Sequence, residues 1–214
     1  MNTLNFYPGP SKLEPNIIGY ISNAVNSGLL ERNHRSQEFA LLYQETKELF
    51  HSQLSVPKDY ELLFLSSATE CWEVISQSLV AKKSEHVFNG AFGRKWFDYA
   101  SNLSNTTSKH FYSHNDHFPV EVISYDSDLL ALTHNETSNG TYLNEKVLSN
   151  LRNMYKDKLI AYDATSSMGG LKFDWEMADI WFASVQKCFG IPSGLGVMVI
   201  SPRAIERARA LGKA

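Results

Sequence analysis

Short apolar runs alternate with amphipathic stretches along most of this chain. The runs predict buried strands, because they are continuously apolar but too short for buried helices. They lie at residues 62–65, 86–88, 129–133, 159–162, 180–183 and 197–200, with a weaker candidate at 109–112. Apolar residues at helical spacing predict helices at 14–27, 37–50, 69–79, 96–103 and 144–155, and from 202 onward. This alternation predicts an α/β fold with a mainly parallel, helix-covered sheet.

The chain is predicted to form one α/β domain preceded by a short N-terminal segment. Its 214 residues, 43% of them hydrophobic and 20% charged, suit one large domain. We place the N-terminal segment and first helix at residues 1–35 and the α/β domain at residues 36–214. Two prolines around Gly9 fix a turn at the entry, and Ser36 is expected to cap the following helix.

Composition and charge exclude several functional classes. The formal net charge is -3, and no basic stripe predicts nucleic-acid binding. Cys71 and Cys188 are too few for a disulfide scaffold. His110, His114 and His117 lie close in sequence, but no paired-histidine or cysteine spacing supports a metal site. No basic N-terminal region precedes an apolar run, and no run reaches the length of a membrane span, so we expect a cytoplasmic protein.

Lys187 stands in the most unusual stretch of the chain, between the apolar runs at 180–183 and 197–200. Three glycines and a proline separate it from the second run, and such residues form irregular turns where the backbone can approach a ligand. A lysine buried there would lose its proton readily, because burial disfavours the charged form, and a neutral amine can attack a carbonyl carbon. On this stretch alone, a surface lysine in a loop is the commoner arrangement.

Other chemically distinctive residues also follow predicted strands, where the functional groups of parallel sheets collect. The helix that opens after residues 62–65 offers free N–H groups and a positive dipole end to a phosphate. An aspartate at a buried strand end can keep a ring nitrogen protonated, and an aromatic in a glycine turn can cover a ring face. These residues are Ala68, Thr69, Phe92, residues 135–137, Asp163 and Lys187. Together they meet the demands of pyridoxal phosphate (PLP), whose pyridinium nitrogen needs an acidic partner.

With these residues the chain resembles the class V aminotransferases of fold type I, and within them the phosphoserine aminotransferase branch. The resemblance implies the large domain of a PLP-dependent transferase, with a mainly parallel sheet of the seven-stranded type. It also implies a C-terminal small domain that this chain lacks. Six short motifs carry the resemblance, in the family's order and over nearly the whole chain: residues 6–11 (FYPGPS), 34–39 (HRSQEF), 89–93 (NGAFG), 134–138 (HNETS), 163–167 (DATSS) and 186–190 (QKCFG).

The resemblance assigns roles around the cofactor ring. Lys187 is expected to form the covalent bond to PLP and later to move protons during the reaction. Asp163 would face the ring nitrogen. Phe92 would stack on the ring, where relatives often have tryptophan, and Thr137 would lie near the ring's 3-oxygen.

The resemblance also implies contacts with two phosphate groups. Ala68 and Thr69 would give backbone and hydroxyl contacts to the cofactor phosphate, helped by Gln186. His34 and Arg35 resemble a pair that, in the phosphoserine branch, reaches the substrate phosphate of an adjacent subunit. We therefore expect a homodimer with shared active sites in the full-length protein.

The implied activity is transfer of an amino group between an amino acid and a 2-oxo acid. Phosphoserine and glutamate are the expected donors, with 3-phosphohydroxypyruvate and 2-oxoglutarate as acceptors, in serine biosynthesis. Thr69 departs from this branch, which usually has arginine there, and matches the branch that uses alanine, serine and glyoxylate. Two further alternatives stay open: another reaction on the same scaffold, such as cysteine desulfuration or kynurenine hydrolysis, and a non-catalytic fragment of the fold.

Overall fold

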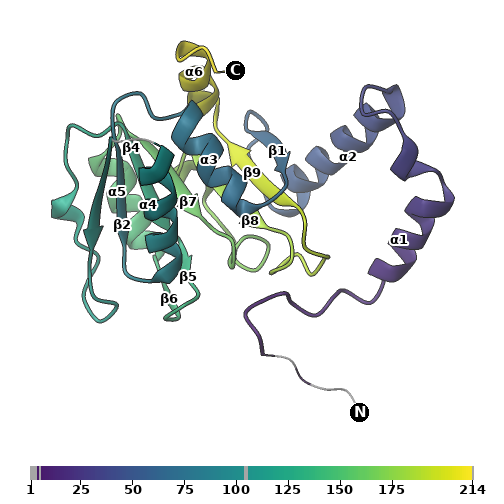
Figure 1. Ribbon diagram of the computed structural model, residues 1–214, viewed down its shortest axis with the longest axis horizontal. Helices are drawn as coiled ribbons and strands as arrows, with labels where there is room; N and C mark the ends of the chain where they lie inside the picture. The colour runs from purple at the N-terminus through teal and green to yellow at the C-terminus, as the bar shows by residue number, and fades with distance from the viewer. Residues whose placement is uncertain (1–3, 5, 104–105, 214) are drawn as a thin grey trace.

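One mixed sheet forms the centre of the molecule (Figure 1). The structure, a computed structural model, describes residue 4 and residues 6–103 and 106–213, so residues 1–3 and 5 of the predicted N-terminal segment lie outside it. The strand order within the described residues is β1-β9-β8-β7-β4-β2-β3. The strands are β1 Glu61–Leu65, β2 Ser84–Phe88, β3 Thr107–Phe111, β4 Leu129–Thr133, β7 Leu159–Asp163, β8 Ile180–Ser184 and β9 Gly196–Ile200.

The sheet is mainly parallel, as the alternation of strands and helices predicts. Strands β3, β2, β4, β7 and β8 pair in parallel, whereas β9 pairs antiparallel with both β8 and β1. Parallel neighbours put their carboxyl ends at the same edge of the sheet. The chemically distinctive residues that follow β4, β7 and β8 are therefore brought to one edge.

Helices cover both faces of this sheet, and the strand side chains alternate between the two faces. Leu129 and Ala131 of β4 pack in one apolar cluster with side chains of α3, α4 and α6. Leu130 and Leu132 point the other way, into a cluster that includes side chains of α5. The predicted helix-covered α/β fold is thus confirmed. The helices are α1 Ile17–Asn26, α2 Gln37–Gln53, α3 Ala68–Ser78, α4 Ala91–Leu103, α5 Glu145–Met154 and α6 Pro202–Ala210.

Short elements connect the layers. Among the described residues, a two-stranded hairpin follows β4, and three 3-10 turns lie in the connections. These elements are β5 Asn135–Glu136, β6 Thr141–Tyr142, η1 Leu29–Glu31, η2 Val120–Val122 and η3 Trp175–Met177. Within the part of the chain that the structure describes, no helix combines the length and apolar character needed to span a membrane.

The first strand differs from the prediction. Residues 62–65 were expected to form a buried strand, but β1 lies at the edge of the sheet and pairs only with β9. Leu63 and Phe64 are 37% and 38% exposed. An apolar run alone cannot distinguish an edge strand from a central one, because the run reports side-chain character and not the number of neighbouring strands.

The N-terminal helices also differ from the prediction in their packing. Helix α1 begins at Ile17, not at residue 14, and most of its predicted apolar face is open to solvent: Ile18, Ile21 and Val25 are 72%, 49% and 55% exposed. Figure 1 shows α1 and the start of α2 projecting away from the sheet. The predicted cap of α2 is confirmed, since Ser36 Oγ accepts the N–H of Phe39 at 3.2 Å.

Asp128 connects the loop before β2 to helix α6 at the amino ends of the parallel strands. Its carboxylate accepts the backbone N–H groups of Ala81, Lys82 and Lys83 and pairs with the guanidinium of Arg207. Burial opposes the charge, but these donors outweigh burial and hold the pKa of Asp128 below its usual value.

We expect Asp128→Ala to lower the free energy of unfolding by about 3 kcal/mol at pH 7, because it takes the acceptor from three backbone N–H groups and the carboxylate partner from Arg207. A lowered folded-state pKa stabilises the protein above the unfolded value near 4, and that stabilisation is lost as the pH falls through the folded pKa. Urea unfolding at pH 7 and pH 3 should therefore show a smaller difference from wild type at pH 3. Asp126→Ala is the matched control; its side chain is 67% exposed, and its loss should change stability much less than the loss of Asp128. An equal effect of both variants would contradict this account.

Candidate functional site

A cavity of about 230 Å³ lies at the carboxyl edge of the sheet. The connections after β4, β7 and β8 form it, together with the first turns of α3 and α4. All the residues that the sequence assigned to the cofactor meet here, although they come from five separate stretches of the chain. The lining residues are Ala68, Thr69, Trp72, Phe92, Thr133, Asn135, Thr137, Asp163, Thr165, Ser166, Ser184, Gln186 and Lys187.

Asp163 ends strand β7 and is the buried charge of this cavity, with 3% of its surface exposed. The backbone N–H of Thr165 donates to Oδ1 at 3.0 Å, and the indole Nε1 of Trp72 donates to Oδ2 at 3.3 Å. Burial raises the pKa of Asp163, and the donors from Thr165 and Trp72 offset this only in part. The carboxyl group therefore favours a positively charged partner, which would stabilise its ionised form.

The first turn of α3 forms another wall. Ser67 caps the helix by accepting the N–H of Glu70 at 3.1 Å, and Ala68 N–H donates to Ser184 Oγ at 3.3 Å. Strand β9 passes so close that a Cβ at Gly196 would lie 2.6 Å from the carbonyl of Ser67. Glycine is needed at this position for the close approach. The helix N-terminus is thus fixed where it can hold an anion.

Phe92 lies in the first turn of α4 and not in a free turn as predicted. Helix α4 begins at Ala91, because the buried carboxylate of Glu136 accepts the N–H groups of Phe92 and Gly93, each at 3.1 Å. The two glycines of the motif have a packing reason. A Cβ at Gly90 would lie 2.3 Å from Glu136 Cγ, and one at Gly93 would lie 2.4 Å from Phe88 Cβ.

Three polar side chains meet on the wall formed by the β5 turn and the connection after β7. Thr137 Oγ1 donates to Ser166 Oγ at 2.8 Å, and Asn135 Nδ2 donates to the same oxygen at 2.7 Å. The sequence drew attention to residues 135–137 but not to Ser166. Ser166 lies in a run of small polar residues directly after Asp163. Such a run is also common in ordinary turns, so the sequence pattern alone could not identify Ser166 as a site residue.

Lys187 follows β8 and is half-buried, so the burial expected from its flanking apolar runs is not found. Its Nζ donates to the carbonyl oxygen of Pro8 at 3.0 Å. Gly9 lies directly against the lysine, and a Cβ there would be 2.6 Å from Lys187 Nζ. The N-terminal stretch is anchored beside it, since Ser11 Oγ donates to the Lys187 carbonyl at 2.6 Å.

His34 and Arg35 do not line the cavity. Both are exposed in the turn before α2, where the N–H of Arg35 donates to Asn33 Oδ1 at 2.8 Å. Their predicted role involves an adjacent subunit and not the cavity of their own chain.

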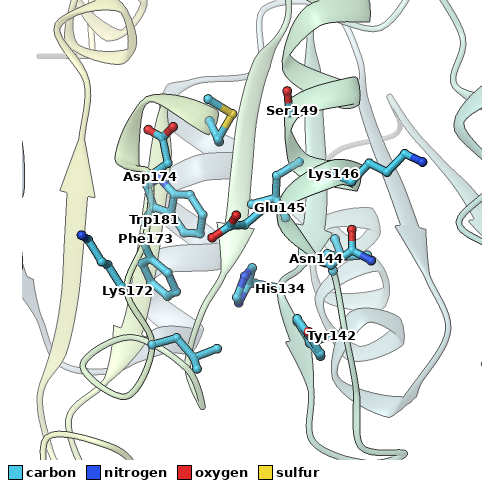
Figure 2. A pocket seen from close by; sticks show the side chains of 14 residues that line it. His134, Tyr142, Asn144, Glu145, Lys146, Ser149, Lys172, Phe173, Asp174 and Trp181 are labelled. Atoms are coloured by element: carbon cyan, nitrogen blue, oxygen red, sulfur yellow. The ribbon is translucent and has the colours of Figure 1, made fainter.

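A larger hollow of about 950 Å³ lies between α5 and the residues after 170, and Figure 2 shows it. It is lined in part by His134, whose Nδ1 lies 2.8 Å from Ser167 Oγ and whose burial lowers its pKa to about 4. His134 points into this hollow, whereas its neighbours Thr133 and Asn135 line the smaller cavity. The larger hollow contains neither Asp163 nor Lys187, so size alone would not lead to the residues that the sequence assigned to the cofactor.

Known proteins resemble this chain in sequence and in fold. The family model described as "Aminotransferase class-V" matches residues 106–213, about half of the chain. A phosphoserine aminotransferase of Corynebacterium glutamicum is 32% identical over 203 residues, which cover 93% of this chain and 52% of that protein. The crystal structure of a phosphoserine aminotransferase from Cytophaga hutchinsonii is 39% identical, with a TM-score of 0.89, and covers 95% of this chain and 57% of that one.

The fold extends to more distant structures. A PLP-bound phosphoserine aminotransferase from Trichomonas vaginalis is 21% identical with a TM-score of 0.74, over 95% of this chain and 59% of that one. At that identity the likeness shows the fold alone. The chain spans about half the length of the curated relatives it matches.

Proposed function

The chain belongs to the class V aminotransferase family, and we propose that its strand-end cavity binds pyridoxal phosphate and serves transfer of an amino group between an amino acid and a 2-oxo acid. One observation carries this proposal. Asp163 and Lys187, an acidic partner for a ring nitrogen and a primary amine, line the same small cavity beside a helix N-terminus.

The polar groups of the cavity fit this cofactor. Thr133 Oγ1 and Gln186 Oε1 are buried without a hydrogen-bond partner among the described residues. Buried polar atoms are usually paired, so two unpaired atoms around one cavity favour a polar ligand there. A planar ring that carries a phosphate, a hydroxyl group and a basic nitrogen would offer such partners.

Each wall of the cavity would hold one part of the cofactor. The ring nitrogen would face Asp163, and Phe92 would cover one face of the ring. The N-terminus of α3, at Ala68 and Thr69, would hold the phosphate, with Gln186 nearby.

Once bound, the cofactor supplies an electron sink for a carbanion next to the amino group. Asp163 would hold the proton on the ring nitrogen through its carboxylate. Lys187, which lines the same cavity, would move protons on Nζ. Thr137 would lie near the ring oxygen, where its hydroxyl is already oriented by Ser166.

We propose a phosphorylated or acidic amino acid as one substrate, with phosphoserine and glutamate as donors. The named relatives and the exposed Arg35 support this, because a guanidinium binds oxyanions as a bidentate fork. In a homodimer, Arg35 would serve the active site of the neighbouring subunit. A cytoplasmic location and a role in serine biosynthesis belong to the same proposal.

One observation favours a second candidate, a donor such as alanine or serine with glyoxylate as acceptor. Thr69 is exposed at the N-terminus of α3, where the phosphoserine branch usually has arginine. The loss of one charge-assisted hydrogen bond would weaken binding of a substrate phosphate by about 1.5–3 kcal/mol. That loss would make phosphoserine a weaker candidate for the amino donor but would not exclude it.

The two candidates are separated by Arg35→Ala. We expect it to slow the half-reaction with phosphoserine and with glutamate by about tenfold to a hundredfold, the loss expected for a charge-assisted contact, and to spare alanine. The measurement follows conversion of the PLP form to pyridoxamine phosphate after mixing with each donor. Arg32→Ala, three residues earlier, is the matched control. If all donors are equally affected or equally spared, Arg35 is a loop residue and the phosphoserine proposal should be dropped.

The non-catalytic alternative is tested by the same assay without a variant. The 214-residue chain and a full-length phosphoserine aminotransferase are compared in the presence of PLP. Conversion of PLP to pyridoxamine phosphate by the chain would exclude a purely structural role. Covalent binding of PLP without this conversion would show that the chain has a cofactor site but does not transfer the amino group.

A further inference from the structure

We propose that Trp72 is a positioning residue that keeps the Asp163 carboxylate ionised and turned toward the ring nitrogen of the cofactor, an inference that rests on the proposed function. Trp72 is not among the residues that the sequence motifs assign to the site. It lies one helical turn after Ala68 on α3, with 8% of its surface exposed, and it lines the same cavity.

The indole ring of Trp72 is held in place from two sides. It stacks on Trp96 with a centroid distance of 6.4 Å and an interplanar angle of 12°, and it meets Tyr99 edge-on at 6.1 Å. Its N–H therefore has little freedom to turn away from Asp163 Oδ2, which it reaches at 3.3 Å. The aromatic contacts thus fix the orientation of the Trp72 N–H, and its hydrogen bond fixes the orientation of the Asp163 carboxylate.

The two donors to Asp163 differ in what they connect. Thr165 follows Asp163 by two residues, so its N–H is part of the local turn. Trp72 lies 91 residues earlier and on another element. Its hydrogen bond therefore links the ring-nitrogen end of the cavity to the helix whose N-terminus would hold the cofactor phosphate. The link fixes the relative position of the two groups that a rigid cofactor must contact together.

Charge explains why the donor matters. Burial raises the pKa of Asp163, and the nearby Glu136 raises it further, whereas the donors from Thr165 and Trp72 lower it. Burial raises the pKa of the Cys71 thiol, and the nearby Asp163 carboxylate raises it further. Lys187 lines the same cavity as Asp163. A neutral carboxyl group cannot form an ion pair with a pyridinium nitrogen. Each donor that keeps Asp163 ionised therefore favours cofactor binding.

The chain provides a matched pair of variants. Trp96 is 1% exposed and packs against Trp72, but its own Nε1 is buried without a partner. Trp72→Phe and Trp96→Phe each remove the pyrrole part of an indole from the same cluster, and only the first removes a hydrogen bond. We expect Trp72→Phe to weaken PLP binding by about tenfold to a hundredfold at neutral pH, as for loss of a hydrogen bond to a charged group. Trp96→Phe should not share this effect once both variants are shown to be folded.

The pH dependence separates positioning from packing. PLP affinity should fall as the pH is lowered and Asp163 takes up a proton. Trp72→Phe should move this loss of affinity, the acid limb of the pH profile, to higher pH, because Asp163 then takes up its proton more easily. Trp96→Phe should leave the acid limb at the wild-type pH. If the two variants lose affinity equally, or if neither shifts the acid limb, Trp72 is a packing residue and the proposal is wrong.

A measurement without the cofactor keeps this test independent of the proposed function and of variant folding. In the wild-type chain, the ¹⁵N–¹H signal of the Trp72 indole should move as the Asp163 carboxyl, followed by ¹³C, is titrated. The Trp96 signal should not follow that titration. A Trp72 signal insensitive to Asp163 would overturn the proposal. Failure of the chain to bind PLP, with the coupled titration present, would instead count against the proposed function alone.

Discussion

Replacing Lys187 by alanine should abolish covalent attachment of PLP while leaving the fold intact. The amine is the covalent partner in the proposed function, and no other primary amine lines the cavity within the described residues. Its structural contribution is small, because the side chain is half-buried and its Nζ bonds only the Pro8 carbonyl among the described residues. We therefore expect a change in unfolding free energy of about 0.5–1 kcal/mol or less.

The effect on turnover should be large. A positioned group that moves protons contributes about 100-fold to 10,000-fold to the rate, and loss of the covalent step adds to this. The measurement is peptide mapping by mass spectrometry after incubation with PLP and reduction with borohydride. The wild-type chain should carry the label at Lys187, and the variant should carry none in that peptide.

Lys172→Ala is the control, since Lys172 is exposed and lines the larger hollow of Figure 2. It should retain the label at Lys187. Labelling of the wild type at many surface lysines without preference for Lys187 would refute the assignment. So would a site-specific absorbance band that survives in Lys187→Ala.

The strands that carry the site are predictable from the sequence because they are buried on both faces. Strand β4 matches its predicted bounds, and β7 and β8 extend the predicted runs by one residue each, to Asp163 and Ser184. A run flanked by helices on both faces must be continuously apolar, so its length and position can be recognised. The run in β1 is equally apolar, but β1 lies at an edge of the sheet. The strand that it pairs with, β9, lies more than a hundred residues later in the chain.

Long-range contacts explain what the sequence could not predict about the site. The start of α4 is set by Glu136, which lies more than forty residues after the Phe92 and Gly93 N–H groups that it accepts. The environment of Lys187 is set by Pro8 and Gly9, at the other end of the chain. The motifs therefore identify residues at the cavity, but the partners that orient those residues are fixed only by the tertiary fold.

The exposed apolar face of α1 has a similar explanation. Helical spacing correctly predicts a helix there, because local propensity and periodicity are properties of the segment itself. Whether the apolar face is covered depends on what packs against it. Nothing within the described residues covers Ile18 or Val25, which are 72% and 55% exposed.

Asp163→Asn should lower kcat by about 100-fold to 1,000-fold, the range for removing one preorganised electrostatic group from an active site. In the proposed function, the carboxylate stabilises the protonated ring nitrogen most strongly when negative charge develops on the ring. An interaction that is strongest in the transition state appears mainly in kcat, so KM should change much less. PLP affinity should fall by about tenfold to a hundredfold, as for Trp72→Phe, because the carboxylate would also pair with the ring nitrogen in the bound state. Asp179→Asn is the control: Asp179 is equally buried and bonded to Arg152, but it lies at the opposite end of the sheet. That control should lower stability and leave kcat of the folded protein unchanged.

The same substitution has an opposite signature in the chain without cofactor. Because the folded-state pKa of Asp163 is raised, the folded protein holds its proton more tightly than the unfolded chain. Stability from this group is therefore fully present below the unfolded pKa near 4 and falls as the pH rises toward the folded value. Asparagine does not titrate, so wild type should lose stability relative to Asp163→Asn as the pH rises from 4 to 7. Asparagine has one side-chain oxygen and cannot accept from both Thr165 and Trp72. This loss changes the stability difference between the two proteins by a constant amount and does not make it depend on pH. Urea unfolding across this pH range measures the slope. An unchanged kcat together with a flat stability difference would show that Asp163 is only a cap at the end of a strand.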